Sequence, residues 1–122
     1  MGEGNVGRVD LAWQDKIAVM TLAGDVSFDS LARLQDVFSE ATKTTRRIAV
    51  DLSETEFLGS AAVGMLLSRG LSLTKAGGGL MLCNVSQKVR SLLELLGIHD
   101  CFRICGTVDD GIRQLKAIAD RP

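Results

Sequence analysis

Hydrophobic and polar positions along the first half of the chain predict three strands. Residues 9–13 alternate between apolar and polar side chains, as in a half-buried strand, and residues 17–22 form a second apolar run. The polar turn 14–16 between them predicts a β-hairpin. The central run, residues 48–52, contains Ile and Val and is typical of a strand that is buried on both faces.

Helical periodicity marks the segments between and after these strands. Apolar residues three and four positions apart predict a helix over about residues 29–41. Residues 61–73 are apolar on nearly every face, which predicts a buried helix after a short polar loop. Two further helices are expected after Ser86 and Thr107, since both residues are favourable N-caps.

Short apolar strands predicted at residues 80–83 and 101–104 complete the order β-β-α-β-α-β-α-β-α. Strands that alternate with helices favour an α/β fold with a mixed, mostly parallel sheet and helices packed against it. The N-terminal hairpin would supply the antiparallel pair. We therefore expect one domain over residues 7–120 and a flexible Gly-rich lead-in over residues 1–6.

Composition excludes several classes of function. The 122 residues carry a net charge of −1 and only 4% aromatic side chains, which disfavours a nucleic-acid surface. No apolar run approaches the roughly 20 residues of a membrane span, and the N-terminus has no apolar signal core, so a cytoplasmic protein is expected. The three cysteines lack Cys-x-x-Cys spacing, so neither a zinc site nor a disulfide framework is expected.

Ser60 is the polar residue between the central strand and the apolar helix. A serine here can be an N-cap, whose hydroxyl accepts a hydrogen bond from a backbone N–H two or three residues later. It can also be functional, because helix N-termini at the carboxyl ends of strands lie where open α/β sheets bind ligands, phosphate included. The pattern alone leaves both interpretations open. Gly64, inside the predicted helix, suggests close packing of the helix on the sheet.

The residues around Ser60 resemble the signature of the STAS domain, the fold of bacterial anti-sigma factor antagonists. Residues 22–28 also resemble the family's strand-to-helix turn, so the resemblance covers nearly the whole chain. The chain departs from the signature where Gly59, Ala61 and Ala62 replace an acid, Ser or Thr, and Gly. The matching positions are Asp51, Leu52, Ser53, Phe57, Leu58, Ser60, Val63, Gly64, Leu66 and Leu67.

The resemblance implies an interaction module and not an enzyme. The family's phosphoacceptor serine falls on Ser60. The implied partners are an anti-sigma factor that is itself a serine kinase, and a PP2C-type phosphatase. In this scheme the unmodified protein captures the kinase and frees the sigma factor, phosphorylation of Ser60 releases the complex, and the phosphatase restores it. The resemblance thus implies regulation of transcription by partner switching, without a cofactor or metal.

Polar residues at the carboxyl ends of neighbouring strands are expected to surround Ser60. Asp25, Ser53 and Glu56 are the candidates, although each can equally be turn chemistry. The predicted partner-binding set is Asp25, Ser27, Ser53, Glu56, Gly59, Ser60, Ala61 and Ala62.

Two alternatives remain. The same fold could act without a switch, as a scaffold in a stress-signalling assembly or as a subunit of a lipid transporter. A small α/β enzyme or nucleotide binder is less well supported. The single histidine, His99, could complete a triad with Ser60 only on paper, since the Gly-x-Ser-x-Gly elbow is missing. No Gly-x-Gly-x-x-Gly opens a helix.

Overall fold

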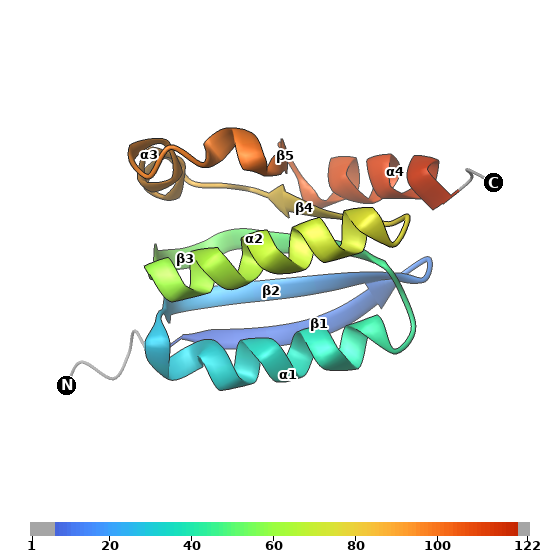
Figure 1. Cartoon of the computed structure of the whole chain (residues 1–122), viewed down its shortest axis with the longest axis horizontal. Coiled ribbons are helices and arrows are strands. Elements are labelled where there is room, and N and C mark those ends of the chain that lie inside the picture. Colours follow the sequence, from blue (N-terminus) through green and yellow to red (C-terminus); the bar gives the residue numbers. More distant parts are fainter. Residues whose placement is uncertain (1–6, 120–122) are drawn as a thin grey trace.

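The strands form one five-stranded mixed sheet in the order β1-β2-β3-β4-β5 (Figure 1). In this computed structural model, which describes residues 7–119, β1 and β2 are antiparallel and the remaining neighbours are parallel. The predicted fold class is confirmed, whereas the predicted lead-in, residues 1–6, lies outside the described residues, as does residue 120. The strands are β1 (Arg8–Gln14), β2 (Ile17–Val26), β3 (Arg47–Leu58), β4 (Gly79–Cys83) and β5 (Arg103–Cys105).

Helices cover both faces of this sheet. Alternation along β4 shows the division, because Leu80 and Leu82 join the core with α1, α2 and α3 while Met81 and Cys83 join the core with α4. Strand β4 is buried throughout, which explains its continuous apolar sequence. The helices are α1 (Leu31–Thr42), α2 (Ser60–Lys75), α3 (Gln87–Leu95) and α4 (Val108–Ala119), with short 3₁₀ turns at Phe28–Ser30 and His99–Cys101.

Side-chain caps begin the two C-terminal helices as predicted. The Ser86 hydroxyl accepts a hydrogen bond from the Val89 N–H, and the Thr107 hydroxyl accepts one from the Asp110 N–H, each at 3.1 Å. Gly97 follows α3 with φ +74, the left-handed conformation that a glycine at this position adopts readily. These boundaries were therefore readable from local chemistry.

Strand β3 is longer than predicted. The expected polar loop after residue 52 is strand as far as Leu58, because β2 also continues past Gly24 and keeps pairing with it. Two register shifts, one on each side of residues 23–24, bend the pair. The Thr55 hydroxyl donates to the Leu22 carbonyl at 2.8 Å and holds the strands together there. The polar residues 53–56 thus belong to the sheet.

Helix α2 is less buried than its composition suggested. Its buried residues are Ala62, Val63, Leu66 and Leu73, so one face packs on the sheet and the other is open. Gly64 is exposed, and a Cβ added there would meet no atom within 4 Å, so the expected close approach to the sheet is wrong at this residue. The last strand also starts later than predicted, since Cys101 lies in a 3₁₀ turn.

Two helical glycines provide a matched test of packing. A Cβ at Gly111 in α4 would lie 2.7 Å from the Cys83 Sγ and 3.0 Å from the Cys105 Sγ. We expect Gly111→Ala to lower the free energy of unfolding by about 1–3 kcal/mol, as overpacking does. Gly64→Ala should raise it by about 0.5–1 kcal/mol, because only the helix propensity changes. Urea denaturation measures both, and shifts in the same direction would contradict the packing described.

The cysteines provide a second test. Cys83 and Cys105 are buried side by side with their Sγ atoms 3.3 Å apart, and Cys101 is exposed. Burial, followed by the hydrogen bond with Cys105, raises the pKa of the Cys83 thiol well above its usual range. Iodoacetamide at about pH 8 should therefore add one group to the folded protein and three after denaturation, as read by intact mass. A folded Cys101→Ser variant that still reacted would contradict this.

Candidate functional site

Ser60 is the first residue of α2 and its side chain is exposed. The N-cap is Gly59, with φ −68 and ψ 159, so the predicted N-cap was one residue too late. No side chain caps this helix start, and the Ser60 hydroxyl is not used as a cap. The first N–H groups of a helix have no partner within the helix and carry the positive end of its dipole. The hydroxyl is therefore free for chemistry at an electropositive helix end.

The end of β2 holds the residues before Ser60 in place. The Gly59 N–H donates to the Val26 carbonyl at 2.9 Å, directly after the last pair of the β2–β3 ladder. A Cβ at Gly59 would lie 3.2 Å from both Cα and Cβ of Ser27. The chain therefore passes close to Ser27, and a side chain at this position would require Ser27 to shift slightly. Ser27, Gly59 and Ser60 form one continuous surface.

Asp25 lies near the end of β2, two residues before Ser27. It pairs in register with Phe57, and its side chain is half-buried, with an Oδ1 atom that is shielded from solvent and without a hydrogen-bond partner in the described structure. Gly7 lies against the Asp25 carbonyl, where a Cβ would come within 2.5 Å of the oxygen. Asp25 is thus only partly open to a partner.

The remaining predicted site residues divide into three groups. Ala61 and Glu56 are exposed near Ser60 in the chain. Ala62 is fully buried, so its side chain does not reach the surface, where we had expected it to contact a partner. Ser53 is exposed but lies seven residues before Ser60, mostly along an extended strand, which places it roughly 20 Å away. The structure therefore does not bring Ser53 into the same site.

Sequence reasoning missed an apolar groove between the end of β3 and α3. Its volume is about 290 Å³, and Glu56 and Lys88 lie on its border. Phe57 and Leu95 are 48% and 83% exposed, although both are large apolar residues. The sequence offered one signal of this groove, because Leu95 is an apolar residue outside the apolar stripe of α3. Leu58, Val89 and Leu92 complete the apolar lining.

A metal site or a Ser60–His99 pair would need particular side chains to lie together within residues 7–119. No group of three or more His, Cys, Asp or Glu side chains could hold a metal ion in this part of the chain. The His99 Nε2 lies 3.2 Å from the Asp100 Oδ1, and no hydrogen bond in the described residues joins His99 to Ser60. None of the helices in the described part is long and apolar enough to span a membrane.

Comparison with known proteins agrees with this arrangement. The model of the STAS domain matches residues 8–111. The anti-sigma F factor antagonist of Paenibacillus polymyxa is 21% identical over 114 residues, covering 92% of this chain and 97% of that protein. The crystal structure of an anti-sigma factor antagonist from Mycobacterium paratuberculosis superposes with a TM-score of 0.81 at 20% identity, covering 95% of this chain and 99% of that one.

Two further solved structures share this fold, and their proteins differ in function from each other. SpoIIAA of Bacillus in its phosphorylated form has a TM-score of 0.68 at 20% identity, covering 88% of this chain and 98% of that one. A sulfate transporter family protein from Wolinella succinogenes has a TM-score of 0.73 at 18% identity, covering 90% of this chain and 93% of that one. Since the family model spans most of the sequence, the chain belongs to the STAS domain family.

Proposed function

We propose that this chain is an anti-sigma factor antagonist that binds a serine-kinase anti-sigma factor and is switched by phosphorylation of Ser60. The observation that supports the proposal best is the exposed Ser60 hydroxyl at the start of α2, which no cap interaction occupies. A kinase needs an accessible hydroxyl as its acceptor, and a buried hydroxyl would not serve. The membership of the family and the similarity to an anti-sigma F factor antagonist support the same role.

The helix end explains how one modification can change binding without unfolding the domain. A phosphate on Ser60 adds about −1.5 to −2 charges. The unpaired N–H groups and the dipole of α2 stabilise that charge within the domain itself. A partner that packs on Gly59, Ser60 and Ala61 would instead have to desolvate the phosphate against a surface shaped for small neutral groups. Phosphorylation therefore weakens the complex more than it strains the fold.

The apolar groove supplies the anchor that such an interface needs. Interface energy is concentrated in a few apolar and aromatic contacts, surrounded by weaker ones. Phe57 lies three residues before Ser60 in the chain, and Leu95 lines the same groove from α3. Both side chains expose apolar surface. We infer that the anti-sigma factor inserts an apolar side chain between them. The switch at Ser60 then acts beside the contact that gives affinity.

The proposed cycle includes a second enzyme, a PP2C-type phosphatase, that removes the phosphate and restores binding. In this cycle the protein itself catalyses nothing and acts in the cytoplasm on sigma-factor-dependent transcription. The solved phosphorylated form of SpoIIAA supports it, since that related protein carries the modification.

The switch predicts opposite behaviour for two substitutions at the same position. Ser60→Asp should bind a kinase-type anti-sigma factor of the same organism at least tenfold more weakly, a loss of about 1.4 kcal/mol, because it places a charge in the interface. Ser60→Ala should bind like the wild type and resist phosphorylation. Isothermal titration calorimetry with each variant measures the difference, and equal affinities would refute the switch.

The anchor predicts a loss of affinity without a loss of stability. Leu95→Ser should weaken binding of the same partner by about tenfold or more, as expected for a central apolar contact. Its thermal unfolding should change little, because Leu95 is mostly exposed. Leu71→Ser is a matched control, since Leu71 is also an exposed leucine but lies 11 residues farther along α2. An equal loss of affinity in both variants would argue against the groove.

A second function keeps the fold and omits the switch. Gly59, Ala61 and Ala62 replace residues of the phosphorylation signature, and the same fold occurs in a sulfate transporter family protein. The chain would then be a scaffold in a stress-signalling assembly or a subunit of a lipid transporter. Incubation with the kinase and ATP, followed by intact mass, separates the two functions, because only the switched protein gains a phosphate.

A further inference from the structure

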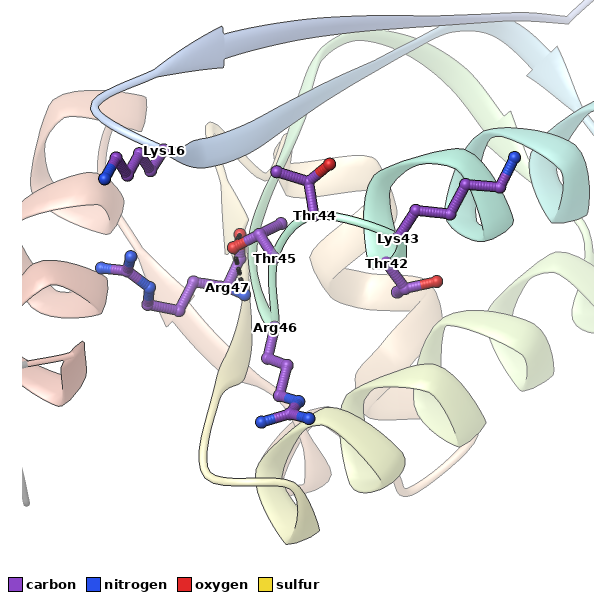
Figure 2. A pocket seen from close by; sticks show the side chains of 7 residues that line it. All are labelled: Lys16, Thr42, Lys43, Thr44, Thr45, Arg46 and Arg47. Atoms are coloured by element: carbon purple, nitrogen blue, oxygen red, sulfur yellow. Dashed lines mark hydrogen bonds between the residues drawn. The ribbon is translucent and has the colours of Figure 1, made fainter.

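A second cavity lies at the edge of the sheet opposite to Ser60. It has a volume of about 350 Å³, within the range of small-ligand sites, and is lined by Lys16 and residues 42–47 (Figure 2). Lys16 belongs to the β1–β2 turn, and residues 42–47 run from the end of α1 into β3. The length of β3 separates this cavity from Ser60 by roughly 30 Å.

Three cations at this cavity are free of acidic partners within residues 7–119. Asp15, next to Lys16 in the chain, is paired instead with Lys116, with its Oδ2 2.6 Å from the Lys116 Nζ. Glu40 pairs with Lys43, the fourth cation of the cavity, at 3.4 Å. None of the ion pairs in the described part of the chain involves Lys16, Arg46 or Arg47. Within the part of the chain that the structure describes, the positive charge of the cavity is therefore not neutralised.

The backbone at Lys16 has the conformation of a tight hairpin turn. Asp15 and Lys16 have φ +53 and φ +69, and positive φ at both central residues is what a two-residue turn of type I′ requires. Glycine adopts this region without cost, whereas other residues occupy it at about 1–2 kcal/mol. A glycine at position 16 would therefore make this turn more stable, and the chain instead has a lysine beside the cavity.

The hydrogen bonds of the loop show which groups could meet a ligand. The N–H groups of Thr44 and Thr45 both donate to the Ala41 carbonyl at 3.1 Å, and the Arg47 N–H donates to the Thr45 hydroxyl. The Arg46 carbonyl accepts from the Gly79 N–H at 2.9 Å. These backbone groups are occupied and hold the loop in place, so side chains must supply the binding.

The positions of the cations indicate the kind of ligand. Figure 2 shows the side chains of Lys16 and Arg47 extending to one side of the loop and that of Arg46 extending to another. Separate positive charges fit a ligand with more than one negative group. Arginine matches phosphate oxygens with two parallel N–H donors. No aromatic side chain lines the cavity, which disfavours a ligand held by stacking of a base.

We propose that this cavity binds an anion with two or more phosphate charges, held by Lys16 and Arg47, whose side chains extend to the same side of the loop. Free polyphosphate compounds and the phosphate headgroups of membrane lipids share this chemistry. The proposal does not depend on phosphorylation of Ser60. Because the two sites lie at opposite edges of the sheet, the anion and the protein partner can be bound at the same time.

Two probes test the proposal on the full chain, namely inorganic tripolyphosphate in calorimetry, and vesicles of phosphatidylcholine with a minor part of phosphatidylinositol 4-phosphate in co-sedimentation. We expect saturable binding to at least one probe, roughly tenfold weaker or worse in Lys16→Gly and in Arg47→Gln. Lys16→Gly should keep or raise the thermal midpoint, because glycine suits the turn, so a loss of binding in this variant is not a loss of folding.

Arg90→Gln is the matched control, since it removes one positive charge from α3, and Arg90 neither lines this cavity nor joins an ion pair of the described residues. It should bind like the wild type. Binding of tripolyphosphate identifies a free polyphosphate as the ligand, and binding of the vesicles alone identifies a lipid headgroup. Binding of neither probe, or equal weakening in Arg90→Gln and Lys16→Gly, would overturn the proposal.

Discussion

The parallel pairing of β2 with β3 is the constraint on which the rest of the molecule depends. It runs from Ala18 opposite Ile48 to Val26 opposite Leu58, through two register shifts. The Gly59 N–H then bonds to the Val26 carbonyl, which fixes where α2 begins. If the pairing ended at residue 52, as the polar sequence suggested, Ser60 would be in a loop without a fixed position. The Ser60 hydroxyl is thus placed by the main-chain hydrogen bonds of the residues that precede it.

The direction of the parallel strands gives the domain two chemically different edges. At the carboxyl edge, α2 begins with free N–H groups, small neutral residues and an apolar groove. At the amino edge, the β1–β2 turn and the loop after α1 gather cations around a cavity (Figures 1 and 2). Because β3 spans the distance between them, one edge can change its charge while the other is hardly affected. The net charge of the whole chain, −1, does not reveal that positive charges gather at one edge.

Packing contributes to the small, neutral surface around Ser60. A Cβ at Gly59 would lie 3.2 Å from Ser27, so a larger residue there would require Ser27 to shift by a few tenths of an ångström. Gly64, by contrast, faces open space, and its cost in helix stability has no compensation inside the domain. Glycines in the same motif therefore have different physical explanations, which only the neighbouring atoms reveal.

The sequence by itself determined the order of the elements, the α/β class and the positions of the caps at Ser86 and Thr107. These features follow from periodicity and from hydrogen bonds between residues three positions apart, so local sequence contains the information. It also located Ser60, through a short motif.

Tertiary structure decided the length of β3, the cap at Gly59, the burial of Ala62 and the groove at Phe57 and Leu95. It also brought Lys16 into one cavity with Arg47, although about 30 residues separate them in the chain. Each of these features arises from contacts between distant segments. A strand extends as far as its neighbour offers hydrogen bonds, and a side chain is buried or exposed according to what packs over it, neither of which the local pattern of polar and apolar residues contains.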